Sequence, residues 1–122
     1  MTPNEYQRNA MRTASGISTS CPENLLLQGV MGMSGESGEA LDIVKKIMFQ
    51  GHELNEATRE HLIRELGDVL WYVATTAEAL NVPLETVMQV NIEKLKARYP
   101  MAFEICLQAH RRRFKTPSDR NQ

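Results

Sequence analysis

Glycine recurs at every third residue in one segment of the chain, at Gly29, Gly32, Gly35 and Gly38. Apolar residues return every three or four positions around these glycines, which predicts a helix over residues 22–50. Inside a helix each glycine should cost about 1 kcal/mol relative to alanine, so this helix needs close approach by another backbone or by a ligand. A phosphate-binding glycine-rich loop is disfavoured, because the Gly-Lys-Ser/Thr ending and a preceding strand are both absent.

The rest of the chain also has helical patterns and no segment typical of a strand. Further helices are expected over residues 3–14, 56–80 and 84–98, with a short one over 102–110. The fold class is therefore all-α, most simply a four-helix bundle. We expect one domain over residues 1–110, followed by a basic tail over residues 111–122.

Two apolar stripes are expected to face the core. In the segment over residues 22–50 the stripe comprises Leu26, Val30, Met33, Ala40, Val44 and Ile47. In the segment over residues 56–80 it comprises Leu62, Leu66, Val69, Val73, Ala77 and Leu80. A different, more polar face of this second segment carries Glu65, Asp68 and Tyr72.

Two pairs of acidic residues provide the main functional signal. Glu36 and Glu39 are three residues apart, as are Glu65 and Asp68, so each pair shares one face of its helix. Four carboxylates brought together would repel one another unless a cation neutralised them, and oxygen ligands suit Mg²⁺ or Mn²⁺ better than Zn²⁺. The alternative is an ordinary solvated helix face. Because both pairs adjoin glycines in apolar segments, we predict a metal site.

Basic and amide side chains follow a compatible pattern. Lys46 lies two helical turns after Glu39, and Asn91, Lys94 and Arg98 form one stripe on the last long helix. These residues either grip phosphate oxygens or form a solvated face. His61 is four residues before Glu65, a spacing found in zinc ligands but more often in surface contacts.

Composition excludes several classes of function. The chain has 122 residues and a formal net charge of −1, so neither nucleic acid nor an anionic membrane is expected as a partner. No apolar run approaches the length of a membrane span, and the first twenty residues lack the pattern of a signal peptide. Cys21 and Cys106 lack metal-ligand spacing and are expected to be reduced. A cytoplasmic location follows as the expectation.

The two acidic pairs lie in the segments Gly35-Glu36-Ser37-Gly38-Glu39 and Glu65-Leu66-Gly67-Asp68. Together these segments resemble the MazG-like all-α nucleoside triphosphate pyrophosphohydrolases, a superfamily that includes dimeric dUTPases and dCTPases. The stretch from Asn91 to Pro100 resembles the family's final helix. The chain departs from the family pattern at Gly35, where many members have a further glutamate. Without that possible ligand, the number of bound metal ions stays open.

This resemblance implies Mg²⁺-dependent hydrolysis of a nucleoside triphosphate between its α and β phosphates, giving a monophosphate and pyrophosphate. It implies metal ligation by Glu36, Glu39, Glu65 and Asp68, with Glu36 or Glu39 acting in catalysis and Glu36 preferred as the base. The implied phosphate contacts are Lys46, Asn91, Lys94 and Arg98. Gln7, Trp71 and Tyr72 are candidate contacts to the base. A homodimer or homotetramer is implied by sites shared between subunits in the family.

Two other functions fit the same residues. Phosphoribosyl-ATP pyrophosphohydrolases have a similar scaffold and cleave the same kind of bond. Alternatively, the chain is a non-catalytic helical module that binds nucleotides or a protein, using its arginine-rich tail. The sequence does not determine which base and sugar are preferred. It also leaves open whether the role is to remove damaged nucleotides or to control an ordinary nucleotide pool.

Overall fold

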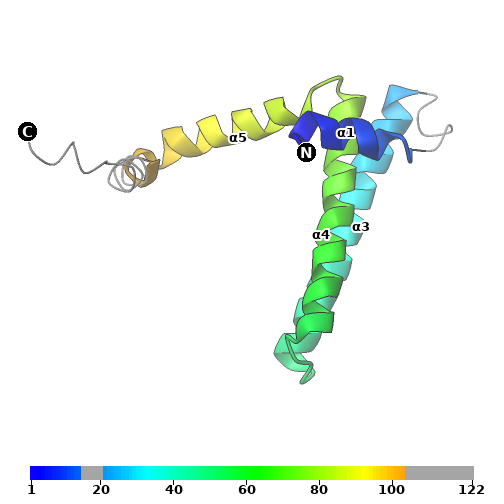
Figure 1. The fold of residues 1–122 in the computed structure, drawn as a ribbon, viewed down its shortest axis with the longest axis vertical. Helices are drawn as coiled ribbons and strands as arrows, with labels where there is room; N and C mark the ends of the chain where they lie inside the picture. The colour runs from blue at the N-terminus through cyan, green and yellow to red at the C-terminus, as the bar shows by residue number, and fades with distance from the viewer. Residues whose placement is uncertain (15–20, 104–122) are drawn as a thin grey trace, which may run out of the picture. The chain divides into compact units, whose positions relative to one another are not determined.

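A computed structural model describes residues 1–14 and 21–103 (Figure 1). The described helices are α1 (Pro3–Met11), α3 (Pro22–Phe49), α4 (Glu56–Ala79) and α5 (Leu84–Arg98). Within residues 1–14 and 21–103 no residue is in a β-strand, so the predicted all-α class is confirmed. The chain divides into two compact units, Met1–Thr86 and Val87–Gln122.

Local capping explains where the helices begin and end. The Thr2 hydroxyl accepts a hydrogen bond from the backbone N–H of Glu5, while the Glu5 carboxylate accepts one from the backbone N–H of Thr2. Asn55 caps α4 through the N–H of Thr58, and Cys21 occupies the same position before α3. Gly51, with a φ of 72°, follows the end of α3 as a left-handed residue. The predicted boundaries are thus confirmed to within a few residues.

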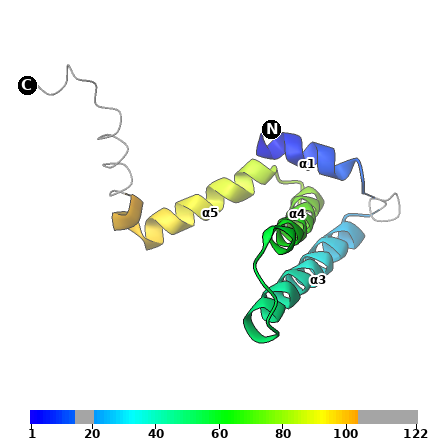
Figure 2. The same ribbon diagram turned by 60° about the horizontal axis from the view of Figure 1, so that its bottom comes forward.

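Helices α3 and α4 run side by side in opposite directions in both views (Figures 1 and 2). A Cβ atom added at Gly29 would lie 2.4 Å from Thr76 Oγ1 and 3.1 Å from the Thr76 backbone nitrogen. One added at Gly32 would lie 2.1 Å from Cε1 of Tyr72. These two glycines therefore permit the close approach of another helix that the sequence required. Nothing lies within 4 Å of a Cβ added at Gly35.

The predicted core stripes of α3 and α4 are partly wrong. Val30 and Val44 of α3 are 53% and 40% exposed, and Leu66 and Leu80 of α4 are 58% and 57% exposed. Of the predicted stripe residues, Ala77 is buried. The other buried residues are Leu25, Gly29 and Ile43 on α3 and Glu65, Ala74 and Thr75 on α4. The reason is steric, because the face with glycine can approach a neighbour more closely than a face with larger side chains. The face of α4 that carries Tyr72 and Glu65 consequently meets α3.

Helix α1 lies across one end of the α3–α4 pair and packs on α4 (Figures 1 and 2). Ala10, Ala74 and Leu84 form a buried apolar cluster there, with Tyr6 and Trp71 packed against it. The indole Nε1–H of Trp71 donates to the Ala10 carbonyl at 3.2 Å and to the Thr13 hydroxyl at 2.9 Å.

Gln7 of α1 fixes the turn between α4 and α5. Its amide nitrogen donates to a Glu78 carboxylate oxygen at 2.9 Å and to the Val82 carbonyl at 3.2 Å. Its amide oxygen accepts the backbone N–H of Leu84 at 2.6 Å, and Asn4 accepts that of Glu85. The first N–H groups of α5 are thus capped from α1 rather than by a neighbour in the sequence.

In the second unit, α5 continues to Arg98, and residues 100–103 are again helical. The ammonium group of Lys96 lies 5.9 Å from the centre of the Phe103 ring. Most of the predicted helix over residues 102–110, and the whole predicted tail, lie outside the described residues. Among the described helices, none is both long and apolar enough to cross a membrane.

Candidate metal centre

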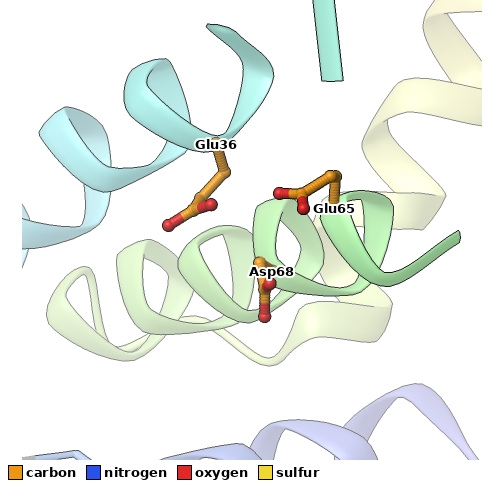
Figure 3. Close-up of side chains that lie close together, drawn as sticks. All are labelled: Glu36, Glu65 and Asp68. Atoms are coloured by element: carbon orange, nitrogen blue, oxygen red, sulfur yellow. The ribbon is translucent and has the colours of Figure 1, made fainter. Parts of the chain in front are cut away.

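Three of the predicted acidic residues come together between α3 and α4. Glu36 extends from α3 toward α4, where Glu65 and Asp68 lie one turn apart (Figure 3). One carboxylate oxygen from each residue can be chosen so that all three lie within 4.8 Å of one another. Glu65 is buried, Glu36 is half-buried and Asp68 is exposed, so the cluster is open on one side.

The charges in this cluster affect Glu36 most clearly. Loss of solvation raises the pKa of Glu36, and the negative charges of Glu39, Asp68 and Glu65 raise it further. The pKa of the Tyr6 phenol on α1 is raised as well, mainly by burial of the phenol and further by the negative charge of Asp68. The site is therefore a place of negative potential that favours a proton or a cation.

Glu39, the fourth predicted ligand, is not in the group of three. It is exposed and lies one turn further along α3, where it lines a hollow of about 390 Å³. Gly35, Gly38 and Lys46 of α3 and His61 of α4 line the same hollow. The two glycines leave open space where side chains would otherwise project.

Lys46, predicted to contact phosphate, forms an ion pair in this structure. Its Nζ lies 2.6 Å from Oδ2 of Asp42, and Lys45 pairs with the other oxygen of the same carboxylate. Hydrogen bonds from Lys45 and Lys46 lower the pKa of Asp42 to about 2. All three side chains are substantially exposed, so a phosphate could compete with Asp42 for Lys46 at little cost.

The remaining phosphate-contact candidates lie on α5. Asn91, Lys94 and Arg98 are all exposed, at the 3 and 4 spacing that places them on one face of the helix. They belong to the second unit, and their contact with substrate stays a prediction.

The three base-contact candidates differ in what they do in the structure. The Gln7 amide makes three hydrogen bonds around the α4–α5 turn, and the Trp71 indole N–H is bonded to residues of α1 and the turn after it. The Tyr72 ring lies against Gly32 and meets Trp71 edge-on, with ring centres 4.9 Å apart. Their contact with a base stays a prediction.

Two residues near the cluster have contacts that sequence reasoning missed or left open. Nε2 of His61 lies 3.0 Å from Oε1 of Glu65, so its spacing of four residues signals a contact with a buried carboxylate. Asp42 was not among the predicted site residues. It lies three residues before Lys45 and four before Lys46, however, and on a helix both spacings indicate an ion pair.

The donor set fits a hard divalent cation. Every oxygen in the cluster belongs to a carboxylate, and two helices hold the three groups together. Glu36, Glu65 and Asp68 would hold Mg²⁺ or Mn²⁺, with Glu39 available from the adjacent turn.

Comparison with known proteins gives one family and one relative. Residues 27–103 match the family described as the MazG nucleotide pyrophosphohydrolase domain. The "Gene 37 protein" of Mycobacterium phage L5 is 46% identical over 69 residues, which cover 56% of this chain and 60% of that protein. No solved structure matches the chain.

Proposed function

Because the chain belongs to the MazG nucleotide pyrophosphohydrolase family, we propose that it hydrolyses a nucleoside triphosphate between the α and β phosphates in a Mg²⁺-dependent reaction. The products would be a nucleoside monophosphate and pyrophosphate. The observation that carries this proposal is the meeting of Glu36 of α3 with Glu65 and Asp68 of α4, within 4.8 Å of one another. A divalent cation relieves their repulsion and makes the cluster a binding site for polyphosphate.

Glu36, Glu65 and Asp68 would hold the cation. When bound, it supplies Lewis-acid polarisation of a phosphate oxygen and a fixed position for the attacking water. The buried Glu65 anchors this set, while the exposed Asp68 leaves one side open to substrate. These residues set the position of the α phosphate, and the hollow beside Gly35 and Gly38 leaves room for the rest of the substrate.

Glu39 is the better candidate for the base that accepts the proton of the water. Sequence reasoning preferred Glu36, but Glu36 is one of the three clustered carboxylates and Glu39 is not. A carboxylate outside the metal-binding set keeps an oxygen free to accept a proton. Glu39 lines the same hollow as His61, whose Nε2 lies 3.0 Å from Glu65, and this supports a role beside the cluster.

Lys46 would offset the charge of the triphosphate from the same hollow. Asn91, Lys94 and Arg98 would complete the phosphate contacts from α5, and Trp71 and Tyr72 remain candidates for the base. Gln7 also remains a candidate, although both of its amide N–H groups donate within the α4–α5 turn. The catalytic domain would occupy residues 1–110, with residues 111–122 outside it.

A homodimer is the assembly that the exposed faces favour. Large apolar side chains on α3 and α4 are exposed in the single chain, among them Leu27, Val30, Met31, Leu41, Ile63, Leu66 and Leu70. So much apolar surface is unusual on a monomer, and a second copy could cover it to complete a four-helix bundle.

The reaction is tested by measuring pyrophosphate release from canonical and modified nucleoside triphosphates, and from phosphoribosyl-ATP, with Mg²⁺ or with EDTA. We expect Mg²⁺-dependent release from one class of triphosphate. The Asp68→Ala variant should lose at least about 100-fold in turnover, because it removes a ligand and several kcal/mol of charge stabilisation. Glu60→Ala is the matched control, an exposed acidic residue on α4 outside the cluster.

Equal turnover by Asp68→Ala and Glu60→Ala would contradict the assigned site. Turnover of phosphoribosyl-ATP alone would replace the substrate class while keeping the site. Binding of nucleotide without turnover, by folded wild-type protein, would favour a non-catalytic module.

A further inference from the structure

One residue outside the proposed ligand set touches it directly. Nε2 of His61 lies 3.0 Å from Oε1 of Glu65, an ion-pair contact when the imidazole is protonated. Both residues are on α4, four positions apart, so the contact spans one helical turn. One carboxylate oxygen of Glu65 thus contacts His61, and the other can face a cation.

The burial of the two partners distinguishes this pair from other pairs on the same helix. The Glu65 side chain is 9% exposed, whereas that of His61 is 61% exposed. Glu60 and Arg64, at the same spacing and only one residue earlier, are 61% and 71% exposed. An exposed pair of this kind adds little to stability. A buried carboxylate, in contrast, needs a polar or charged partner.

Among the clustered residues, Glu65 also has the least freedom to adjust. Glu36 and Asp68 are half-buried and exposed, so water can solvate them and their side chains can rotate. Glu65 is buried, and within the described residues His61 is the ion-pair partner of its side chain. Contact with the His61 ring therefore restricts how the Glu65 carboxylate can turn.

From these contacts we propose that His61 is a positioning residue, which holds the Glu65 carboxylate in the orientation needed to bind the divalent cation. This inference rests on the proposed function, since it assigns Glu65 to the cation. A histidine that orients a ligand in this way affects how tightly the metal binds, without touching the substrate. His61 also faces the same hollow as Lys46, but its positioning role depends on its contact with Glu65.

The test is the affinity of the folded, nucleotide-free protein for Mn²⁺, measured by titration calorimetry or by the electron paramagnetic resonance of free Mn²⁺. His61→Ala should weaken binding by about tenfold, the lower end of the effect seen for residues that orient metal ligands. His61→Gln keeps an N–H donor at the same spacing and should recover most of the affinity. In turnover, His61→Ala should raise the Mg²⁺ concentration needed for half-maximal rate, while kcat at saturating Mg²⁺ stays close to that of wild type.

Two matched controls separate positioning from general effects. Arg64→Ala removes a hydrogen-bonded side chain at the same spacing on the same helix, from a pair outside the cluster. His52→Ala removes a histidine that lines a neighbouring hollow with His61. Both variants should bind Mn²⁺ like wild type.

The outcomes distinguish this inference from the proposed function. Unchanged Mn²⁺ affinity in His61→Ala, or the same loss in Arg64→Ala, would overturn the role of His61 while wild-type turnover still supported the reaction. Absence of both Mn²⁺ binding and turnover in wild-type protein would overturn the proposed function itself, and the role of His61 with it.

Discussion

The two ends of the α3–α4 pair contain the same residue type in different settings. At the end covered by α1, Gly29 and Gly32 let Thr76 and Tyr72 approach α3 to distances that no Cβ would permit. From the middle of α3 onward, in the part called here the open end, Gly35 and Gly38 face open space beside a hollow of about 390 Å³. Glycine therefore gives close helix packing at one end and an accessible helix face at the other.

This contrast separates stability from the proposed chemistry. The packed end contains the fully buried Ala74 and Thr75 and the hydrogen bonds of Gln7. The open end contains the carboxylates, whose mutual repulsion opposes folding and would be relieved by the proposed cation. A rigid packed end can hold the open end in place, because the same two continuous helices form both.

The largest effect on stability is expected from Gln7→Ala at the packed end. This change leaves the backbone N–H of Leu84 and the Val82 carbonyl without their partner, which should cost about 1–3 kcal/mol. Urea unfolding followed by the fluorescence of Trp71, the single tryptophan, measures the change. Gln89→Ala, which removes an exposed glutamine on α5, is the control and should be nearly neutral. Equal stability of the two variants would mean that Gln7 does not hold the turn.

Gly29→Ala tests the close packing with a single methyl group. The new Cβ would lie 3.1 Å from the Thr76 backbone nitrogen, so the helices must move apart rather than a side chain rotate. Overpacking of about 1–3 kcal/mol should exceed the gain of about 1 kcal/mol in helix propensity. We expect net destabilisation of about 1 kcal/mol, measured as a lower urea midpoint. A stabilised variant would contradict the packing of α3 on α4.

Gly35→Ala is the same substitution two turns away and should have the opposite sign. Nothing lies within 4 Å of the added Cβ, so the variant should gain up to about 1 kcal/mol in helix propensity. Thermal unfolding in EDTA gives the change in Tm. Turnover with Mg²⁺ gives a second readout, because a substrate that approaches this helix face would meet the new methyl group. Destabilisation would show that another chain occupies this face.

The smallest effect is expected from the exposed Asp42. Its folded pKa of about 2 lies below the ordinary value of 3.8, because Lys45 and Lys46 bond to the ionised form. Its contribution to stability is therefore present above about pH 3.8 and is lost as the pH falls toward 2. The difference in urea midpoint between wild type and Asp42→Asn should be small near pH 6 and vanish at the acid end. A difference that grows on acidification would contradict this ion pair.

Local signals in the sequence were sufficient to predict the helices and the protein family. Thr2, Asn55 and Gly51 mark helix ends because capping depends on a few neighbouring atoms. The acidic pairs three residues apart indicated which side chains share a helix face, because helical spacing is fixed. The match over residues 27–103 confirms the family that these pairs indicated.

Tertiary structure decided which face of each helix is buried. Periodicity favoured the stripes with Val30 and Leu66, but those residues are exposed and the glycine-bearing face of α3 meets α4. The hydrophobic pattern shows which helix face has the most apolar area, but it does not show how closely two helix backbones can approach on each face. In this protein the face that allows the closer approach is the one that is buried. The same choice of face brought Glu65 into the interface, placed Glu36 and Asp68 beside it and left Glu39 outside the group. Which carboxylates meet is a property of how two helices pack, and the sequence of either helix alone does not contain it.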